Sequence, residues 1–383
     1  MALKQSERGA ISPFIVMDVL RAANRRQESG KAVYHLEVGQ PGTPAPRKVR
    51  EAAAKALEND LIGYTDAMGI EPLRTAISGH YKCKFGVDVD PARICIASGS
   101  SSIFVLAFLA AFDAGDRVAM AAPGYPAYRN ILGALGIETV TLLAGPESHY
   151  QPTVAMLRDL DRPVDGLIVA SPSNPAGSMM DRETYRELVA YCRANGIRLI
   201  SDEIYQGISF GDVAECSALE FGDDAFVINS FSKYFSMTGW RLGWAVVPPD
   251  LCRAVECLQQ NLFISAPALS QIAGVAAFDC EDELQANIAA YARNRDILLN
   301  ELPKAGFDRF APADGAFYLY ADIHHLTDDS EAFCRRMLNE TGVAVTPGTD
   351  FDRLRGQNYV RFSFAHSEQT MLGAVKALQN WQK

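Results

Sequence analysis

Short, continuously apolar runs alternate with longer helix-like stretches from residue 93 onward. Such runs, bounded by turn-forming residues, are typical of short buried strands. They lie at Ile94–Ala97, Val118–Met120, Glu138–Leu142, Leu167–Ala170, Ile197–Ile200, Ala225–Asn229 and Leu242–Val247. Helices are expected between them, for example up to Phe112 and from Pro126. Because the strands are apolar throughout, the pattern predicts a mainly parallel sheet that helices cover on both faces.

The two ends of the chain have a different pattern. Residues 10–29 carry apolar side chains at helical spacing on one face, which predicts a helix that caps another part of the molecule or packs on its own domain. A short strand is expected from Leu36 to the turn at Gly39–Pro44, followed by a helix over about residues 46–58. Residues 251–304 are predicted to be mainly helical, and β-patterned pieces between two helices follow to the end.

These patterns predict an α/β protein with two domains. We expect residues 1–45 to form an N-terminal arm and part of a small domain, and residues 46–280 to form a large domain on the mainly parallel sheet. Residues 281–383 would complete the smaller α+β domain, which the N- and C-terminal segments build together. No period of about 20–50 residues repeats along the chain, which excludes a solenoid.

Composition and charge narrow the class of function. Of the 383 residues, 48% are hydrophobic and 21% charged, as in ordinary globular proteins. The formal net charge of -10 argues against binding to nucleic acid or to an anionic membrane surface. The first residues lack the apolar core of a signal peptide, and the longest apolar run, Ile103–Phe112, is too short to span a bilayer. We therefore expect a cytoplasmic protein.

Eight cysteines are scattered along the chain without a C-x-x-C pair. That spacing indicates neither a zinc cluster nor a framework of disulfides, so we expect reduced thiols and no metal site.

The loop between the last two predicted strands of the sheet concentrates candidate chemistry. Lys233 becomes a nucleophilic amine if burial or a neighbouring cation lowers its pKa. Ser230, Ser232 and Arg241 offer hydroxyls and a planar cation, which suit a phosphate. The alternative is an ordinary surface loop with a solvated lysine.

A second alternative is the S-x-x-K nucleophile motif of penicillin-binding proteins, which Ser230 and Lys233 match. That motif needs S-D-N and then K-T-G further along the chain. Here Ser201-Asp202-Glu203 precedes the loop and Met237-Thr238-Gly239 lies within it, so both order and identity fail.

Polar residues also follow other predicted strands, where ligands bind in parallel sheets. Ser100 and Ser101 open a helix and are suited to an anion, although serine is also a common helix cap. Asn174 lies in a proline-flanked loop, and Asp202 ends a strand, where it either caps the next turn or acts in a site. Arg361 stands among apolar neighbours, so it must face solvent or hold an anion.

Taken together, these motifs resemble one family. Asn174-Pro175-x-Gly177, Ser201-Asp202-Glu203-x-Tyr205, Ser230-x-Ser232-Lys233 with Arg241, and Arg361 are similar to the motifs of class I/II aminotransferases. These are fold-type I enzymes that use pyridoxal 5′-phosphate. The resemblance extends from Gly39-Gln40-Pro41 to Arg361 and implies transfer of an amino group from an L-amino acid to a 2-oxo acid.

The resemblance also implies roles around the cofactor ring. Lys233 would form a Schiff base with the cofactor and then carry a proton as general base. Asp202 would keep the pyridine nitrogen protonated. Asn174 and Tyr205 would donate to the ring oxygen, and Tyr125 would stack on the ring.

Further roles concern the phosphate and the substrate. Hydroxyls and a guanidinium would bind the phosphate, namely those of Ser100, Ser101, Ser230, Ser232 and Arg241. Tyr64 resembles the tyrosine that reaches the phosphate from a second subunit, which implies a homodimer with shared active sites. Arg361, Asn174 and the backbone at Gly39 would hold the substrate carboxylate.

Some relatives carry a lysine where Ser101 stands here, and its absence argues against a preference for aspartate. An apolar arm around Ile11, Phe14 and Ile15 would suit neutral or aromatic substrates if it covers the pocket. Another fold-type I enzyme, such as a C–S β-lyase or a cyclopropane-forming synthase, is the alternative, because it shares the cofactor residues. A transcriptional sensor is disfavoured by the acidic charge and by the lack of a helix-turn-helix before residue 10.

Overall fold

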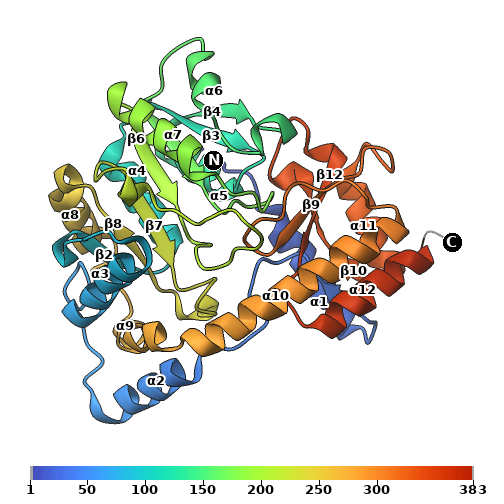
Figure 1. Cartoon of the computed structure of the whole chain (residues 1–383), viewed down its shortest axis with the longest axis horizontal. Coiled ribbons are helices and arrows are strands. Elements are labelled where there is room, and N and C mark those ends of the chain that lie inside the picture. Colours follow the sequence, from blue (N-terminus) through green and yellow to red (C-terminus); the bar gives the residue numbers. More distant parts are fainter. Residues whose placement is uncertain (1–2, 382–383) are drawn as a thin grey trace.

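The computed structural model describes residues 3–381 and is built around a seven-stranded sheet (Figure 1). The strand order is β2-β8-β7-β6-β5-β3-β4, and β8 alone among these strands runs against its neighbours. The strands are β2 (Ile94–Ala97), β3 (Arg117–Ala122), β4 (Glu138–Leu143), β5 (Gly166–Ala170), β6 (Arg198–Asp202), β7 (Phe226–Ser230) and β8 (Gly243–Val246). The predicted mainly parallel sheet is confirmed.

Helices cover both faces of this sheet, so successive residues of a strand point into two different cores. In β5, Ile168 packs with Phe104 on one face, whereas Leu167 packs with Leu188 on the other. This two-sided burial explains why the strands are apolar at every position. The helices of this part are α2 (Arg47–Asn59), α3 (Glu71–Phe85), α4 (Ser100–Ala111), α5 (Pro126–Leu135), α6 (Val154–Arg158), α7 (Arg182–Ala194), α8 (Cys252–Leu262) and α9 (Ala268–Val275).

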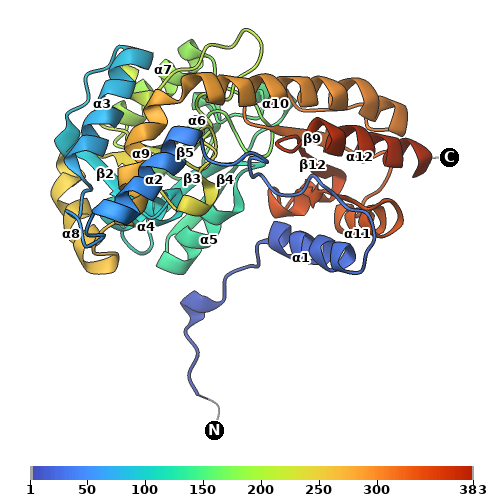
Figure 2. The same cartoon turned by 90° about the horizontal axis from the view of Figure 1, so that it is seen from below.

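A smaller unit combines the two ends of the chain, as predicted for the fold class. Its strands are β1 (Tyr34–His35), β9 (Tyr318–Asp322), β10 (Val343–Ala344), β11 (Thr346–Pro347) and β12 (Tyr359–Ser363). β11, β12 and β9 form an antiparallel sheet, and β1 pairs in parallel with β10. Its helices are α1 (Ile15–Glu28), α11 (Ser330–Thr341) and α12 (Glu368–Trp381). Figure 2 shows α1 beneath α11, with the preceding residues leading away from the molecule.

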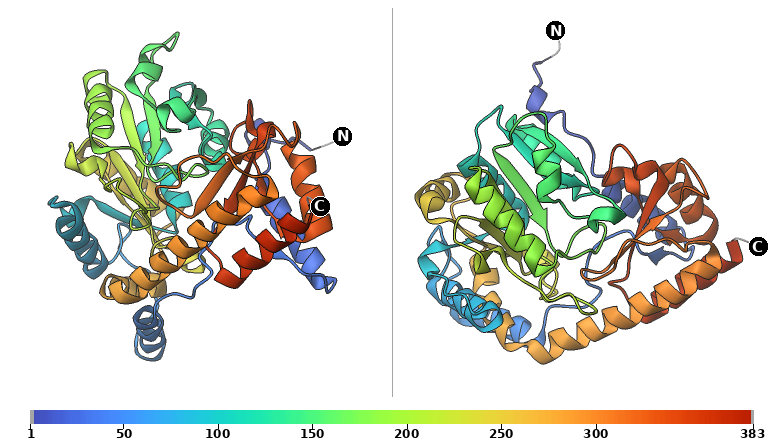
Figure 3. Two further views of the ribbon diagram at one scale, coloured as in Figure 1. Left: turned by 45° about the vertical axis from the view of Figure 1, so that its right-hand side comes forward. Right: turned by 45° about the horizontal axis from the view of Figure 1, so that its top comes forward.

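The helix α10 (Glu281–Glu301) runs along both units (Figure 3). Near its start Leu284 packs into a core of the large sheet, and near its end Leu298 packs with Phe307 of the small unit. The domain boundaries at residues 45 and 280 stay predictions. Within the described residues, no helix combines the length and the hydropathy that a bilayer span requires.

Two boundaries near the N-terminus differ from the sequence prediction. The helix expected from residue 10 begins only at Ile15, because Pro13 disfavours helical geometry for the residue before it. The strand expected from Leu36 is assigned only at Tyr34–His35. Leu36 still bonds on both sides, since its N–H donates to Ala344 O and its carbonyl accepts from Ser363 N.

Candidate active site

A cavity of about 170 Å³ lies between the carboxyl ends of the large-sheet strands and the small unit. Most of the residues expected to act together line it: Gly39, Ser100, Ser101, Tyr125, Asn174, Asp202, Tyr205, Ser232, Lys233, Arg241 and Arg361. Ser230 and Tyr64 are not among the lining residues. Many of these residues come together because the carboxyl ends of parallel strands meet at the same edge of a sheet, where ligands bind.

Lys233 follows β7 and extends its amine into the cavity. Its Nζ donates to the carbonyl of Gly39 over 2.6 Å and lies 5.6 Å from the centre of the Tyr205 ring. Burial and, to a smaller extent, the charge of Arg361 lower the pKa of Lys233 to about 8, against the opposing charge of Asp202. The amine is therefore withdrawn from solvent and partly neutral near pH 7, which argues against the alternative of a solvated surface lysine.

Asp202 ends β6 with its carboxylate buried at the floor of the cavity. Tyr128 Oη donates to one carboxylate oxygen, and the N–H of Ile204 donates to the other over 3.1 Å. Burial raises the pKa of Asp202 to about 6, and the bond from Tyr128 opposes that rise. Tyr128 comes from α5 and was not expected from the sequence, where it looks like one more core aromatic of an amphipathic helix.

The neighbouring carboxylate, Glu203, points away from the cavity. It is fully buried and accepts hydrogen bonds from Ser201, Ser217, Gln206 and the N–H of Ala218. Burial raises its pKa to about 7. Of two consecutive acids at the strand end, only Asp202 is offered to a ligand.

The N-terminal end of α4 forms a cradle for an anion. Gly99, at φ +81°, precedes the helix, and a Cβ there would meet the Arg241 guanidinium at 2.5 Å. Ser100, Ser101 and Ser232 line the cavity beside it. Hydroxyls, helix N–H groups and a guanidinium are the donors that a phosphate requires.

Ser230 stands behind this cradle. Its Oγ donates to Ser232 Oγ over 2.9 Å and accepts from the N–H of Ser232 over 3.1 Å. Ser230 thus orients Ser232 in this structure, and its direct contact with a cofactor stays a prediction.

Arg361 in β12 is 3% exposed, so the alternative that it faces solvent is wrong. Its guanidinium lies between the rings of Tyr318 and Phe351, at 4.3 and 4.7 Å from their centres. Nη1 donates to Asn174 Oδ1 over 2.8 Å, and Nη2 donates to the carbonyl of Glu37. Nε is buried without an acceptor in the described residues. A donor in that condition is suited to a substrate carboxylate.

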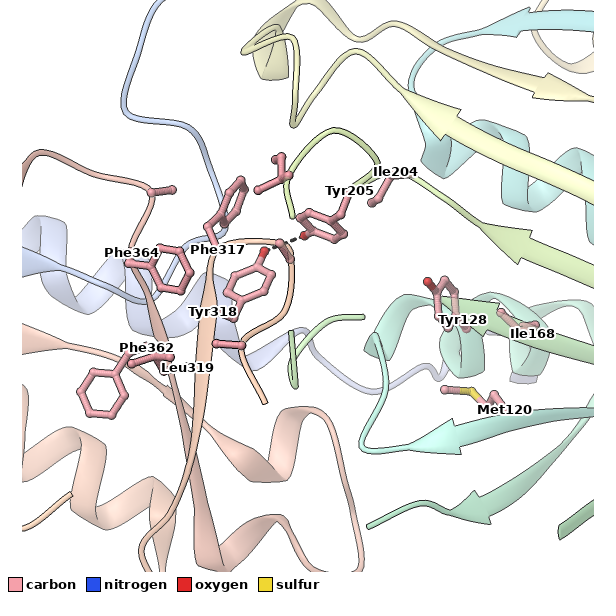
Figure 4. Close-up of a cluster of buried hydrophobic side chains, with 14 of the residues drawn as sticks. Met120, Tyr128, Ile168, Ile204, Tyr205, Phe317, Tyr318, Leu319, Phe362 and Phe364 are labelled. Atoms are coloured by element: carbon pink, nitrogen blue, oxygen red, sulfur yellow. Dashed lines mark hydrogen bonds between the residues drawn. The ribbon is translucent and has the colours of Figure 1, made fainter. Parts of the chain in front are cut away.

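Tyr205 and Tyr318 form a hydrogen-bonded pair across the two units, with 2.6 Å between their hydroxyl oxygens (Figure 4). Burial raises the pKa of both phenols, so they remain protonated donors. Tyr318 also covers Gly39, where any Cβ would collide with its hydroxyl. The sequence predicted Tyr205 and Gly39 but not Tyr318, which reads there as an ordinary strand aromatic.

The first turn of α1 supplies an apolar wall. Phe14, Val16 and Met17 line the cavity, and the Phe14 ring meets the Tyr125 ring edge-on at 5.7 Å. Of the three arm residues singled out in the sequence, only Phe14 lines this cavity. Ile15 instead lines a separate cavity against α11, and Ile11 is exposed.

The chain is similar to known proteins over nearly its whole length. The family model described as aminotransferase class I and II matches residues 31–378. A valine–pyruvate aminotransferase of Mycobacterium tuberculosis is 49% identical, over 98% of this chain and 97% of the relative. A (5-formylfuran-3-yl)methyl phosphate transaminase of Methanocaldococcus jannaschii is 36% identical, over 96% of each chain.

Solved structures extend the likeness to the whole fold. An aminotransferase from Mycobacterium tuberculosis superimposes with a TM-score of 0.98 at 48% identity, over 99% of each chain. The aspartate aminotransferase of Thermus thermophilus with maleate superimposes with a TM-score of 0.92 at 28% identity, over 99% of this chain and 100% of that one.

Proposed function

The chain belongs to the class I and II aminotransferases, which use pyridoxal 5′-phosphate, and from that premise we propose that its amino donor carries an apolar side chain. The enzyme transfers an amino group from an amino acid to a 2-oxo acid. The observation that carries the proposal is the wall of Phe14, Val16 and Met17, which faces the same cavity as Arg361. The name of the valine–pyruvate relative adds support, and we propose pyruvate as one acceptor.

The residues around the cavity fit the cofactor. When bound, pyridoxal phosphate supplies an aldehyde that condenses with amines and a ring that takes up electrons from a broken C–H bond. We assign the phosphate to the cradle of Ser100, Ser101, Ser232 and Arg241, which line the same cavity. We assign Tyr125 to the face of the ring, because it lines the same cavity.

Asp202 would hold the ring nitrogen in its protonated form, because a buried carboxylate stabilises a neighbouring cation. Tyr128 keeps that carboxylate oriented through its hydroxyl. Tyr205 and Asn174 are assigned to the ring oxygen as donors.

Lys233 would hold the cofactor through its amine and then move the proton. Its depressed pKa leaves part of the amine neutral near pH 7, which lets it act first as nucleophile and later as general base at the substrate Cα. The hydrogen bond from Lys233 Nζ to the carbonyl of Gly39 holds the amine beside the backbone that we assign to the substrate carboxylate.

Arg361 binds the substrate carboxylate through its fork, while Asn174 and the Glu37 carbonyl hold the guanidinium in plane. The cations lining the cavity, in the described part of the chain, are Lys233, Arg241 and Arg361, and each already has a role. A second carboxylate on the substrate would therefore face the apolar wall of α1.

The test is a panel of amino donors with pyruvate or 2-oxoglutarate, using enzyme saturated with pyridoxal phosphate. We expect valine, leucine and alanine to be turned over faster than aspartate. A faster reaction with aspartate would contradict the proposed donor class. Ammonia and a 2-oxo acid released without an added acceptor would indicate a lyase.

We also propose a homodimer with shared active sites. Tyr64 is 85% exposed and lies on a surface with other exposed apolar side chains: Leu57, Leu61, Ile62, Leu262 and Ile264. The segments carrying them meet, since Thr65 N donates to Ser265 Oγ over 3.4 Å. A surface of this kind suits a second copy of the chain.

Sedimentation tests the dimer, and subunit mixing tests the sharing. Lys233→Ala and Tyr64→Ala chains, unfolded and refolded together, would form hybrids with one site that has both residues intact. We expect activity to exceed the sum of the two separate variants. No gain in hybrids of proven composition would contradict shared sites, and a monomer would contradict the dimer.

We place the enzyme in the cytoplasm. All eight cysteines carry free thiols, and thiols persist in reducing compartments.

A further inference from the structure

The apolar wall depends on a carboxylate from the other end of the chain. Asp350 closes the short 3-10 helix Gly348–Asp350 after β11 and is 1% exposed. Its Oδ1 accepts from the N–H of Ile15 over 3.2 Å, and Oδ2 accepts from the N–H of Val16 over 3.1 Å. Asp350 therefore caps α1 although it lies 335 residues further along the chain than Ile15.

The cap is required because α1 has none of its own. The residue before the helix is Phe14, whose side chain cannot accept hydrogen bonds. The first N–H groups of a helix lack intrahelical partners, and an anion there also gains from the helix dipole. Without Asp350 these donors would be buried unpaired or the turn would unwind, and this turn carries Val16 and Met17.

Asp350 is connected to residues that adjoin the cavity. Arg129 in α5 donates from Nη2 to the Asp350 carbonyl over 2.5 Å, and it follows Tyr128, which holds Asp202. The next residue, Phe351, packs its ring on Arg361, and its carbonyl accepts from Gly124 N beside Tyr125. A single dipeptide thus connects the apolar wall with the arginine of the substrate carboxylate and with the loop that stacks on the cofactor.

We propose that Asp350 is a positioning residue for substrate selectivity: it anchors the first turn of α1 so that Val16 and Met17 contact the side chain of the amino donor. The inference rests on the proposed preference for apolar donors. It predicts that weakening the anchor reduces discrimination between large and small apolar side chains and leaves the cofactor site intact. Each buried methylene contributes binding that the single methyl of alanine cannot gain, so valine and leucine depend on the wall most.

The test compares Asp350→Ala and Asp350→Asn with the wild-type holoenzyme. For the alanine variant we expect kcat/KM for valine and leucine to fall about tenfold, as loss of a helix cap allows, mostly through KM. For alanine as donor the change should stay below about twofold. Asp350→Asn keeps an acceptor oxygen, so its kcat/KM for valine and leucine should lie between the values of the wild type and of Asp350→Ala. The visible absorption of the bound cofactor should not change, because Lys233 and Asp202 are untouched.

A second readout is independent of turnover. Amide hydrogen exchange in the segment containing Ile15 and Val16 should accelerate in the alanine variant, with α11 unaffected. Asp352→Asn is the matched control. Asp352 is also buried and also accepts backbone N–H groups, but from Leu354 and Arg355 of its own loop. The control should lower stability without changing the valine-to-alanine ratio.

Several outcomes would overturn the role of Asp350. One is an unchanged valine-to-alanine ratio together with unchanged exchange in α1. Another is an equal loss of turnover for every donor, which would mean general support of the site. A change of the valine-to-alanine ratio in Asp352→Asn as large as that in Asp350→Ala would also contradict the role of Asp350. A wild-type enzyme that prefers aspartate would overturn the proposed donor class as well, so the two failures are distinguishable.

Discussion

The two walls of the cavity are built in different ways. On the large-sheet side, Asp202 ends β6, and Lys233 and Arg241 follow β7, within 40 residues of one another in the chain. On the small-unit side, Val16, Gly39 and Arg361 come from opposite ends of the chain. The first wall is a product of strand order, whereas the second exists only when the termini have packed together. We therefore expect the first to determine the chemistry and the second the choice of substrate.

Burial also acts on the two walls differently. It lowers the pKa of Lys233 to about 8 and raises that of Asp202 to about 6, so both values lie within about two units of neutral pH. Arg361 in the second wall is 3% exposed and carries a planar cation. Its charge is met instead by aromatic faces and carbonyl and amide oxygens. Four predictions test this difference, in order of decreasing expected effect.

Lys233→Ala should have the largest effect. Loss of both the covalent anchor and the general base should reduce turnover by more than about 10⁴-fold, and an added small amine should restore part of it. Borohydride reduction of the wild-type holoenzyme should fix the cofactor on the peptide that contains Lys233, as mass spectrometry would detect. Lys304→Ala, an exposed lysine paired with Glu301, is the control. Normal turnover in the Lys233 variant would contradict the assignment.

Asp202→Asn should follow, with kcat lower by about 10³-fold and the cofactor still bound. Tyr128→Phe sharpens the test, because it removes the donor that lowers the pKa of Asp202. The acid limb of its pH–rate profile should move to higher pH, and its rate at neutral pH should fall about tenfold or less. Equal effects of both variants, or cofactor loss as the main defect, would contradict these roles.

Arg361→Gln tests the opposite wall. We expect KM for every amino donor to rise about 10²-fold, because the variant removes a charged partner of the substrate carboxylate, while cofactor absorption stays unchanged. Arg361→Lys should restore only part of the affinity, since lysine lacks the planar fork. Unchanged KM values would show that the carboxylate binds elsewhere.

The smallest effect concerns pH. The rate at which the cofactor-free enzyme captures added pyridoxal phosphate should rise with pH and level off above about 8, because only the neutral amine of Lys233 attacks. Arg361→Gln should move the midpoint upward, since the charge of Arg361 helps to lower that pKa. Stopped-flow absorbance over the pH series provides the measurement. If the pH midpoint of the capture rate in the wild-type enzyme lay near the pKa of a solvated lysine, the argument that burial lowers the pKa of Lys233 would be contradicted.

The contrast between the walls explains which site residues could be found from sequence. Lys233, Asp202 and Asn174 lie within four residues after predicted strands, so the strand-end rule and the motifs are enough to identify them. Tyr128 and Tyr318 were missed, because each lies within a regular element where an aromatic side chain usually means core. Their hydroxyl contacts with Asp202 and Tyr205 arise only from packing between elements.

By itself the sequence determined the order of helices and strands, the mainly parallel sheet and the cofactor motif, because these depend on local periodicity and on short loops. Tertiary structure alone decided that Ser230 stands behind Ser232, that Glu203 turns inward while Asp202 faces the cavity, and that Asp350 caps α1. Such choices depend on burial and on hydrogen bonds between distant segments, for which the linear chain carries no distance information.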